Sequence, residues 1–510
     1  MKAGFLSVFF VLGIVKLVAQ EPADALRYSW LTQNGTARNQ AVGGAGASLG
    51  GEFSSLFINP AGLGFYKTNE FVLTPGYSFK GFSSDYKNNA ESSNSNNFNL
   101  GASGILFSTY SPGRKIVSST FALGVNRMAS FNQDIHYKGL NTNSSYSEKF
   151  LEELRDNNVT DPNSAAMDFP FGSSEAFNTY LIDTTQASDG SVSGYRTQAN
   201  PAFGLMQENR IRASGGITDV SGGFGINLKE KWYFGGTLSF PFLNYTRHGY
   251  YRETDNSGNP DNNFNFFESD EYLNTNGVGI NAKLGAIYKP RQDVRVGFVF
   301  YTPTSYELTD KYSIQITTDL EGYGGSGIKT QSSFDLNNNE YLVSKYKLIT
   351  PLKLIVSGSY IFHSTEDITQ QKGFITADVE YVNYKGAKFK ANPNDDPSAK
   401  DYYSSLSDVI RSTYKNTLNV RIGGELKFDT YMFRIGGAYY GNPYQDEAAN
   451  IYKASGGIGY RNKGIFIDLT YVYTFIKDVN YPYRLEDKSN VPAYIKNNAG
   501  NVIMTVGFKI

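Results

Sequence analysis

Apolar and polar residues alternate along most of the chain after about residue 70. Every second residue of 502–510 is apolar, and the same period of two recurs in 232–242 and in 278–288. Successive side chains of a β-strand point to opposite faces, so this period gives each strand one apolar and one polar face. The pattern therefore predicts a chain built mainly from β-strands.

Fourteen segments show this alternation. They lie near 70–80, 97–110, 116–131, 209–228, 231–250, 271–289, 293–314, 341–362, 371–388, 414–428, 431–441, 450–461, 464–479 and 500–510. The links between them alternate in length along the chain. Short links fall at 112–113, 229–230, 290–291, 363–370, 429–430 and 462–463, and long polar links at 81–96, 132–208, 251–270, 315–340, 389–413 and 480–499.

This sorting of the links is typical of outer-membrane β-barrels, whose periplasmic turns are short and whose outer loops are long. A soluble sandwich has no reason to sort its loops, and a propeller would show blade repeats. Lipid cannot satisfy the backbone groups of an open edge, so a sheet in a membrane must close. We therefore expect an all-β fold, a 14-stranded antiparallel transmembrane β-barrel over residues 69–510, with a long outer loop at about 132–208.

The first residues have the features of a secretory signal peptide. Lys2 precedes an apolar run at 5–15, and the small residue Ala19 follows. A transmembrane helix needs about 18 or more apolar residues, which this run does not reach. We expect a signal peptide at 1–19, cleaved near Ala19 or Gln20. The protein is then expected in the outer membrane of a Gram-negative cell, with both chain ends in the periplasm.

The composition excludes several classes of protein. The 510-residue chain carries 47 Lys+Arg and 48 Asp+Glu, so it lacks the excess positive charge with which nucleic-acid binders neutralise phosphates. It has no cysteine, and His136, His248 and His363 are too far apart for a metal-binding motif. The sequence shows no phosphate-binding loop and no nucleophile elbow. We expect no nucleic-acid partner, no metal, no cofactor and no enzymatic activity.

Two motifs precede the first expected strand. Residues 37–47 read Ala-Arg-Asn-Gln-Ala-Val-Gly-Gly-Ala-Gly-Ala, and residues 55–63 read Ser-Leu-Phe-Ile-Asn-Pro-Ala-Gly-Leu. They resemble the N-terminal plug of the FadL-type outer-membrane transporters of long-chain fatty acids and hydrocarbons. The resemblance implies that about residues 20–68 block the lumen, through a motif of Gly43, Gly44, Gly46, Asn59, Pro60, Ala61 and Gly62. Glycine permits conformations closed to other residues, and Asn-Pro favours a rigid turn. A Gly-rich periplasmic tail without a role is the alternative.

Shorter segments extend the resemblance over the mature chain. Residues 301–304, 350–353 and 373–378 look like the branch of the family common in Bacteroidetes. Fourteen is also the family's number of strands. The resemblance implies a monomer among outer-membrane lipids that takes up a hydrophobic small molecule passively. In that family the ligand passes from outer loops to a pocket near the plug and leaves through a gap in the third strand, here near 116–131. Fatty acids, aromatic hydrocarbons and haem-like compounds all fit.

A second function is compatible with the same resemblance. PorV-like relatives in Bacteroidetes bind exported cargo in type IX secretion and transport no lipid. Their barrels are shorter, which favours transport for a chain of 510 residues. Lipid that co-purifies in the lumen would favour transport, whereas a stable complex with exported proteins would favour the shuttle.

Charged residues occupy inward positions of the eighth to eleventh expected strands, if the alternating apolar residues face lipid. They are Lys353, Asp378, Glu380, Arg421, Glu425 and Arg434. Opposite charges at matching heights on neighbouring strands are expected to pair, because an unpaired charge in a partly dry lumen is costly. The alternative is functional: Lys353 or Arg421 stays free to meet the carboxylate of an acyl ligand.

The long outer loop contains two expected helices with apolar side chains. The candidates for a groove that catches a hydrophobic ligand are Phe150, Leu151, Leu154, Phe177 and Leu181. A small loop core that packs on itself explains the same residues equally well.

Three prolines interrupt expected strands. Pro241, Pro303 and Pro351 each lie about ten or eleven residues from a short turn, a distance at which a tilted strand has crossed the hydrocarbon. Proline has no N–H for a ladder bond, so it belongs at bulges or unpaired edges. We expect all three near the outer interface, at bulges or at a lateral gap.

Overall fold

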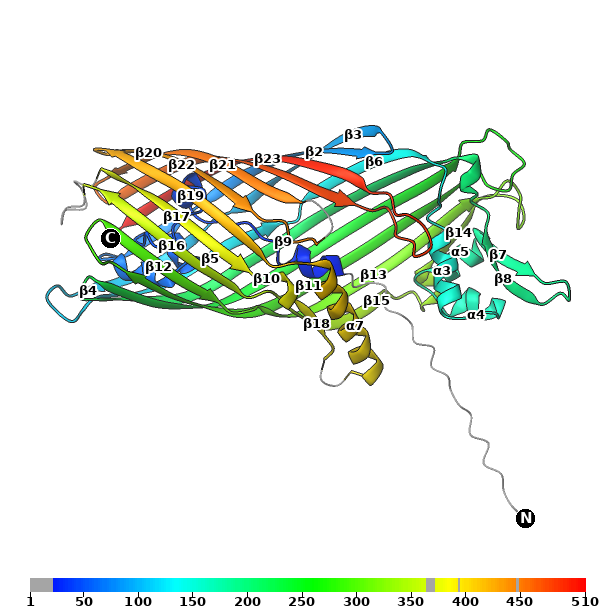
Figure 1. Ribbon diagram of the computed structural model, residues 1–510, viewed down its shortest axis with the longest axis horizontal. Helices are drawn as coiled ribbons and strands as arrows, with labels where there is room; N and C mark the ends of the chain where they lie inside the picture. The colour runs from blue at the N-terminus through cyan, green and yellow to red at the C-terminus, as the bar shows by residue number, and fades with distance from the viewer. Residues whose placement is uncertain (1–21, 364–371, 393–394, 446–448) are drawn as a thin grey trace, which may run out of the picture.

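Antiparallel pairing closes the sheet into a barrel of fourteen strands, which confirms the expected fold class. β1 (Glu70–Leu73) and β2 (Pro75–Tyr86) form the first strand, and both pair with β23 (Ala493–Lys509), the last strand. The short turns lie at one end of the barrel with the C-terminus, and the long connections lie at the other end (Figure 1). We call these the short-turn end and the long-loop end.

The computed structural model describes residues 22–363, 372–392, 395–445 and 449–510, so the expected signal peptide lies outside the described residues. Breaks divide several wall strands into two segments. The remaining wall segments are β3 (Asn89–Leu100) with β4 (Ser103–Tyr110), β5 (Ile116–Ser130) with β6 (Gln133–Asn141), β9 (Leu205–Leu228), β10 (Trp232–Asp255), β11 (Phe266–Tyr288), β12 (Val294–Tyr301) with β13 (Ser305–Asp319), β15 (Leu342–Ile349) with β16 (Lys353–Phe362), β17 (Gly373–Val382), β19 (Thr417–Phe428), β20 (Tyr431–Tyr440), β21 (Asn450–Asn462) and β22 (Ile465–Asn480).

Smaller elements occupy the long connections and the N-terminal segment. They are α1 (Pro22–Arg27), α2 (Ala37–Ala41), η1 (Phe53–Leu56) and η2 (Pro60–Phe65) before the wall; α3 (Glu148–Asp156), α4 (Pro162–Met167), α5 (Ser173–Asn178), β7 (Ile182–Gln186), β8 (Val192–Thr197) and η3 (Pro201–Phe203) before β9; β14 (Lys329–Ser332) and α6 (Ser333–Leu336) before β15; and η5 (Tyr384–Gly386), β18 (Lys388–Lys390) and α7 (Pro397–Thr413) before β19. No helix in the described part of the chain is long and apolar enough to cross a membrane.

Several links expected to be long and polar are shorter than the alternation pattern indicates. The expected loop 81–96 is wrong, because β2 and β3 form a hairpin that turns at Lys87 and Asn88, whose φ angles are +53° and +62°. β23 likewise begins at Ala493 rather than near residue 500. These strands run beyond the lipid-facing zone, where both faces carry polar residues and the period of two disappears from the sequence. The expected short link 363–370 lies mostly outside the described residues.

The wall is tall on one side and low on the other. β9 and β10 each have 24 residues, whereas β17 and β20 have ten. On β10 the outward residues Phe234, Leu238 and Phe242 are 40–52% exposed, and polar Asn244 follows them. A band of lipid-facing residues is about 25 Å tall, which ten tilted residues span. The short strands therefore end where this apolar belt ends, and α7 lies outside the barrel beside that low rim (Figure 1).

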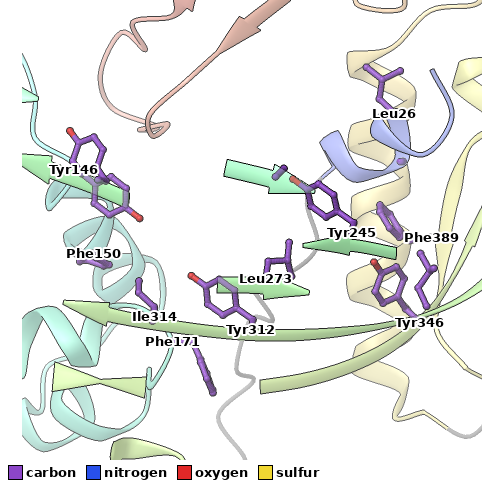
Figure 2. Close-up of a cluster of buried hydrophobic side chains, with 14 of the residues drawn as sticks. Leu26, Tyr146, Phe150, Phe171, Tyr245, Leu273, Tyr312, Ile314, Tyr346 and Phe389 are labelled. Atoms are coloured by element: carbon purple, nitrogen blue, oxygen red, sulfur yellow. The ribbon is translucent and has the colours of Figure 1, made fainter. Parts of the chain in front are cut away.

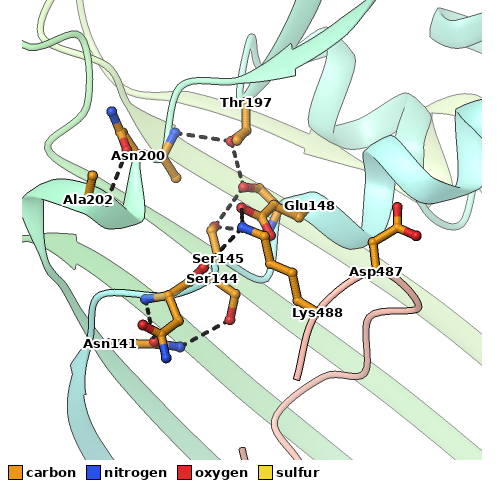
Figure 3. Close-up of polar contacts among 12 residues, drawn as sticks. Asn141, Ser144, Ser145, Glu148, Thr197, Asn200, Ala202, Asp487 and Lys488 are labelled. Atoms are coloured by element: carbon orange, nitrogen blue, oxygen red, sulfur yellow. Dashed lines mark hydrogen bonds and ion pairs between the residues drawn. The ribbon is translucent and has the colours of Figure 1, made fainter. Parts of the chain in front are cut away.

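An aromatic core fills the barrel toward the long-loop end. Tyr245, Tyr312 and Tyr346 of the wall pack with Phe150 of α3 and with Leu26 of α1 in one buried cluster (Figure 2). Polar contacts hold the loops above this core, among them the ion pair of Lys488 and Glu148 at 2.7 Å (Figure 3). The long connections thus form a packed cap.

Candidate functional site

The N-terminal segment, residues 22–69, runs through the barrel from the aromatic core to the start of β1 at the short-turn end. The glycines of its motif lie where the backbone of the segment comes very close to the wall. Gly43 and Gly44 have φ angles of +72° and +75°, and a Cβ on Gly43 would lie 2.6 Å from the Gly437 carbonyl oxygen. A side chain at Gly43 would therefore strain the backbone and collide with β20.

The Asn-Pro-Ala-Gly motif forms a capped turn against the opposite wall. The Asn59 side chain accepts from the Ala61 N–H at 3.1 Å and donates to the Ala47 carbonyl at 2.5 Å. Pro60 stands at the start of η2, where a missing N–H costs nothing. A Cβ on Gly62 would lie 2.5 Å from the Ser55 hydroxyl. The motif thus fixes a tight fold of the segment.

Backbone groups of the same segment bond to a buried carboxylate of the wall. Asp378 on β17 accepts from the Gly46 N–H at 3.1 Å, from the Ala47 N–H at 3.3 Å and from the Ser357 hydroxyl at 2.6 Å. Asp378 is fully buried. A buried carboxylate requires such donors, so this residue ties the segment to the wall.

The structure brings the six candidate lumen charges to the inner wall and pairs most of them. Arg421 lies 3.0 Å from Glu380 and 3.7 Å from Asp378. Arg434 lies 2.5 Å from Glu425, directly opposite it across the β19–β20 ladder. Arg421 and Arg434 are almost completely buried. These pairs belong to a ladder of charges between strands.

Two partners in this ladder are not among the predicted lumen charges. Arg38 on α2 binds Glu425 through two hydrogen bonds of 3.0 Å, and Asp468 on β22 lies 2.6 Å from Arg434. Asp468 alternates with outward Ile467 and Leu469, and this alternation is the signal that marks it as inward. For Arg38 the sequence gives a weaker signal. A charged residue in a segment expected inside the lumen needs a partner of opposite charge on the wall.

A cavity of about 80 Å³ lies between the N-terminal segment and the wall of the third to ninth strands. Its apolar lining includes Phe57, Met128 and Tyr306, and its other lining residues are mainly polar. Lys283 lines it too and is neutralised by Asp219 at 3.0 Å. This set of residues suits a ligand with an apolar body and a polar end.

Lys353 is the candidate lumen charge without a close partner. It lines the cavity, and its ammonium group makes no ion pair or hydrogen bond with a described residue. It feels the charge of Glu380, but Glu380 is held by Arg421 at 3.0 Å and by Asn419 at 2.8 Å. An ammonium group facing a cavity can bind a carboxylate.

The three prolines lie beside this cavity. Pro303 and Pro351 occupy the breaks between β12 and β13 and between β15 and β16, directly opposite each other in register. The β10–β11 ladder also skips Pro241. Pro241 and Pro351 line the cavity. Ladder pairing is thus interrupted at one height across several strands.

The second and third strands separate toward the long-loop end. Their ladder runs from Tyr110 and Ser118 to Ser103 and Val125, and no described residue of β3 pairs with β5 or β6 beyond it. Side chains bridge the interval instead, as Lys80 donates to the Asn132 carbonyl at 2.9 Å. β5 carries a bulge here, and its Met128 lines the cavity.

The apolar residues of the outer loop do not form an open groove. Phe150, Leu154 and Leu181 are at most 1% exposed in the aromatic core, and Leu151 and Phe177 pack against it. The alternative, a loop core that packs on itself, describes their positions. Among the described residues, no group of His, Cys, Asp or Glu has an arrangement that fits a metal ion.

Comparison with known proteins places the fold. No protein-family model matches the sequence, and no curated protein is significantly similar to it. A FadL homologue of Pseudomonas aeruginosa superposes with a TM-score of 0.53 at 12% identity, over 94% of this chain and 99% of that one. The toluene transporter TodX of Pseudomonas putida gives 0.52 at 12% identity, with the same coverage. The barrel has the fold of FadL-type outer-membrane proteins.

Proposed function

We propose that the protein takes up hydrophobic small molecules passively across the outer membrane. The supporting observations are the fold shared with a toluene transporter and the cavity between the N-terminal segment and the wall. In this proposal the short-turn end faces the periplasm, and residues 22–69 act as the plug. The plug blocks the lumen to ions while the cavity receives the ligand.

The ligand is proposed to be an amphipathic molecule with a carboxylate, such as a long-chain fatty acid. The single observation that carries this is Lys353, whose ammonium group reaches the cavity without an ion-pair partner in the described part of the chain. An acid that enters a partly dry lumen needs a cation to offset its lost hydration. Phe57, Met128 and Tyr306 offer apolar surface for the first carbons of the acyl chain, since a cavity of about 80 Å³ holds no more of it.

The test replaces Lys353 with Met and compares a fatty acid with the alcohol of the same chain length. A charge-assisted hydrogen bond contributes about 1.5–3 kcal/mol, so binding of the acid is expected to weaken by roughly 10- to 100-fold. Binding of the alcohol is expected to stay unchanged. Lys311→Met, an exposed site on the outer face of β13, is the control. Equal losses for acid and alcohol would refute recognition of the carboxylate.

The exit is proposed at the separation between the second and third strands. Met128 is the bulged residue of β5 and lines the cavity, so it lies between the cavity and this separation. Because the chain has no cysteine, Met128→Cys introduces a single thiol. A lipid-soluble maleimide is expected to label it, and bound ligand is expected to slow the labelling. Ala122→Cys, buried within the continuous ladder, is the unlabelled control. Equal labelling of both thiols would place the exit elsewhere.

The cargo-binding shuttle remains the alternative prediction. Mass spectrometry of what elutes with the detergent-purified protein separates the two functions. Lipidic acids in the eluate support uptake, and a stoichiometric exported protein without lipid supports the shuttle.

A further inference from the structure

A group of lysines gathers on the outer face of the low wall. Lys345 on β15, Lys385 on η5, and Lys388 and Lys390 on β18 are all exposed. β18 pairs with β15, and Lys390 stands directly opposite a fifth lysine, Lys347. We call these five residues the lysine patch.

The lysine patch lies at the level where the apolar belt ends. Ile375 and Val379 of β17 face outward, 47% and 45% exposed. β17 has ten residues, about the length of one tilted crossing of the hydrocarbon. It ends at Val382, so Lys385 and β18 follow at the interface. The patch is therefore at the height of lipid headgroups.

Most charges of the patch have no ion-pair partner among the described residues. Lys347 pairs with Glu307 at 2.8 Å, but no described residue forms an ion pair with the side chains of the other four. The outer face of the tall wall differs, since Arg210 binds Asp134 at 2.9 Å and Arg252 binds Glu268. Like charges directly opposite in a ladder are unfavourable, as with Lys347 and Lys390. An anion bound between these two lysines would attract both of them and so offset their repulsion.

We propose that the lysine patch binds the phosphate groups of a phosphorylated glycolipid in the outer leaflet. Lysine binds phosphate as a point charge, and clustered lysines beside a membrane attract anionic headgroups within a Debye length. Several lysines on two adjacent short elements suit a headgroup that carries more than one phosphate. The assignment rests on the proposed orientation, with the long-loop end outside.

The test uses the full-length barrel in detergent, titrated with bisphosphorylated lipid A and monitored by native mass spectrometry. The variant Lys345→Gln, Lys385→Gln, Lys388→Gln and Lys390→Gln is expected to weaken lipid binding at least tenfold. The matched control replaces four exposed lysines of the short-turn end, Lys115, Lys229, Lys231 and Lys463, and is expected to bind as the wild type does. An unchanged heat shift on a semi-native gel shows that both variants are folded.

Two further probes identify the ligand. Dephosphorylated lipid A is expected to bind the wild type as weakly as the variant binds the phosphorylated form. Millimolar inorganic phosphate is expected not to displace the lipid. Equal binding of both lipids, displacement by inorganic phosphate, or equal losses in the variant and the control would overturn the proposal. Fatty-acid binding at Lys353 is measured separately, so a failure here is distinct from a failure of the proposed uptake.

Discussion

The two halves of the lumen are filled by different physical means. Toward the short-turn end, the N-terminal segment meets the wall through buried charges, such as Arg38 with Glu425. Toward the long-loop end, α1 and the outer loops meet it through aromatic side chains, such as Phe150 and Tyr312. A buried ion pair is specific because loss of one partner leaves the other charge buried and uncompensated. An apolar core loses stability in proportion to the volume removed.

The largest test of this comparison removes the N-terminal segment altogether. Deletion of residues 22–66 takes the filling from the short-turn half and leaves its wall charges to water, and it also removes α1 from the aromatic core. The wall strands pair with one another from residue 70 onward, so a folded barrel is expected. Single-channel conductance to small ions is expected to rise at least tenfold over the intact protein. Unchanged conductance would show that the long connections and the wall close the lumen without the N-terminal segment.

A single charge reversal disrupts the ion pairs in the short-turn half of the lumen. Arg434→Glu places three carboxylates together, with Glu425 and Asp468, and is expected to cost about 3–5 kcal/mol. The temperature of the heat shift on a semi-native gel should fall. Arg291→Glu, at an exposed turn pair with Asp293, is the control and should change it little.

The exchanged pair sharpens the same test. Glu425→Arg with Arg434→Glu would restore a simple two-residue bridge. In this barrel it is not expected to restore heat resistance, because Arg38 would then face a second guanidinium group and Asp468 would face a second carboxylate. Full recovery would mean that Arg38 and Asp468 contribute little to the pairing.

Truncation in the aromatic half should act locally. Leu154 of α3 is fully buried in the core, and Leu154→Ala is expected to cost about 2–4 kcal/mol of cap stability. Limited proteolysis of the outer loops should accelerate while the heat shift of the barrel stays in place. Val409→Ala, at an exposed site on α7, is the control. A lowered heat shift without faster loop cleavage would contradict this division.

The smallest expected effect is a pH dependence of the cap. Burial, with the nearby Glu153 charge, raises the pKa of Glu175 on α5 to about 8. The folded cap then holds a proton that the unfolded loop releases near pH 4.5, so cap stability falls as pH rises from about 5 to 8. Loop proteolysis is expected to accelerate over this window in the wild type and to stay flat in Glu175→Gln. Parallel profiles would show that Glu175 is not the titrating group.

The sequence predicts the parts of the barrel that lipid constrains. Fourteen strands and their short turns follow from alternation, because a lipid-facing side must be apolar. The ladder neighbours Glu425 and Arg434 follow from counting residues across one tight turn. Beyond the belt this constraint ends, so the alternation does not distinguish the β2–β3 hairpin from a loop.

Contacts that depend on the path of the N-terminal segment or on loop packing are harder to predict from the sequence. The partnership of Arg38 with Glu425 joins residues far apart in the chain, and its register depends on how the segment lies in the lumen. The buried positions of Phe150 and Leu181 depend on loop packing, which no period encodes. The same apolar pattern fits a groove or a core.

The path of the N-terminal segment has a consequence for assembly. The segment enters at the aromatic core and leaves at β1, which lies beside β23 at the closing seam. The wall therefore surrounds this segment, and the first and last strands of the wall meet where the segment joins β1. We expect the segment to take its place before the wall closes, because it would otherwise have to be threaded into a closed barrel. Pairing of β1 and β2 with β23 then holds the N-terminal segment inside the closed wall.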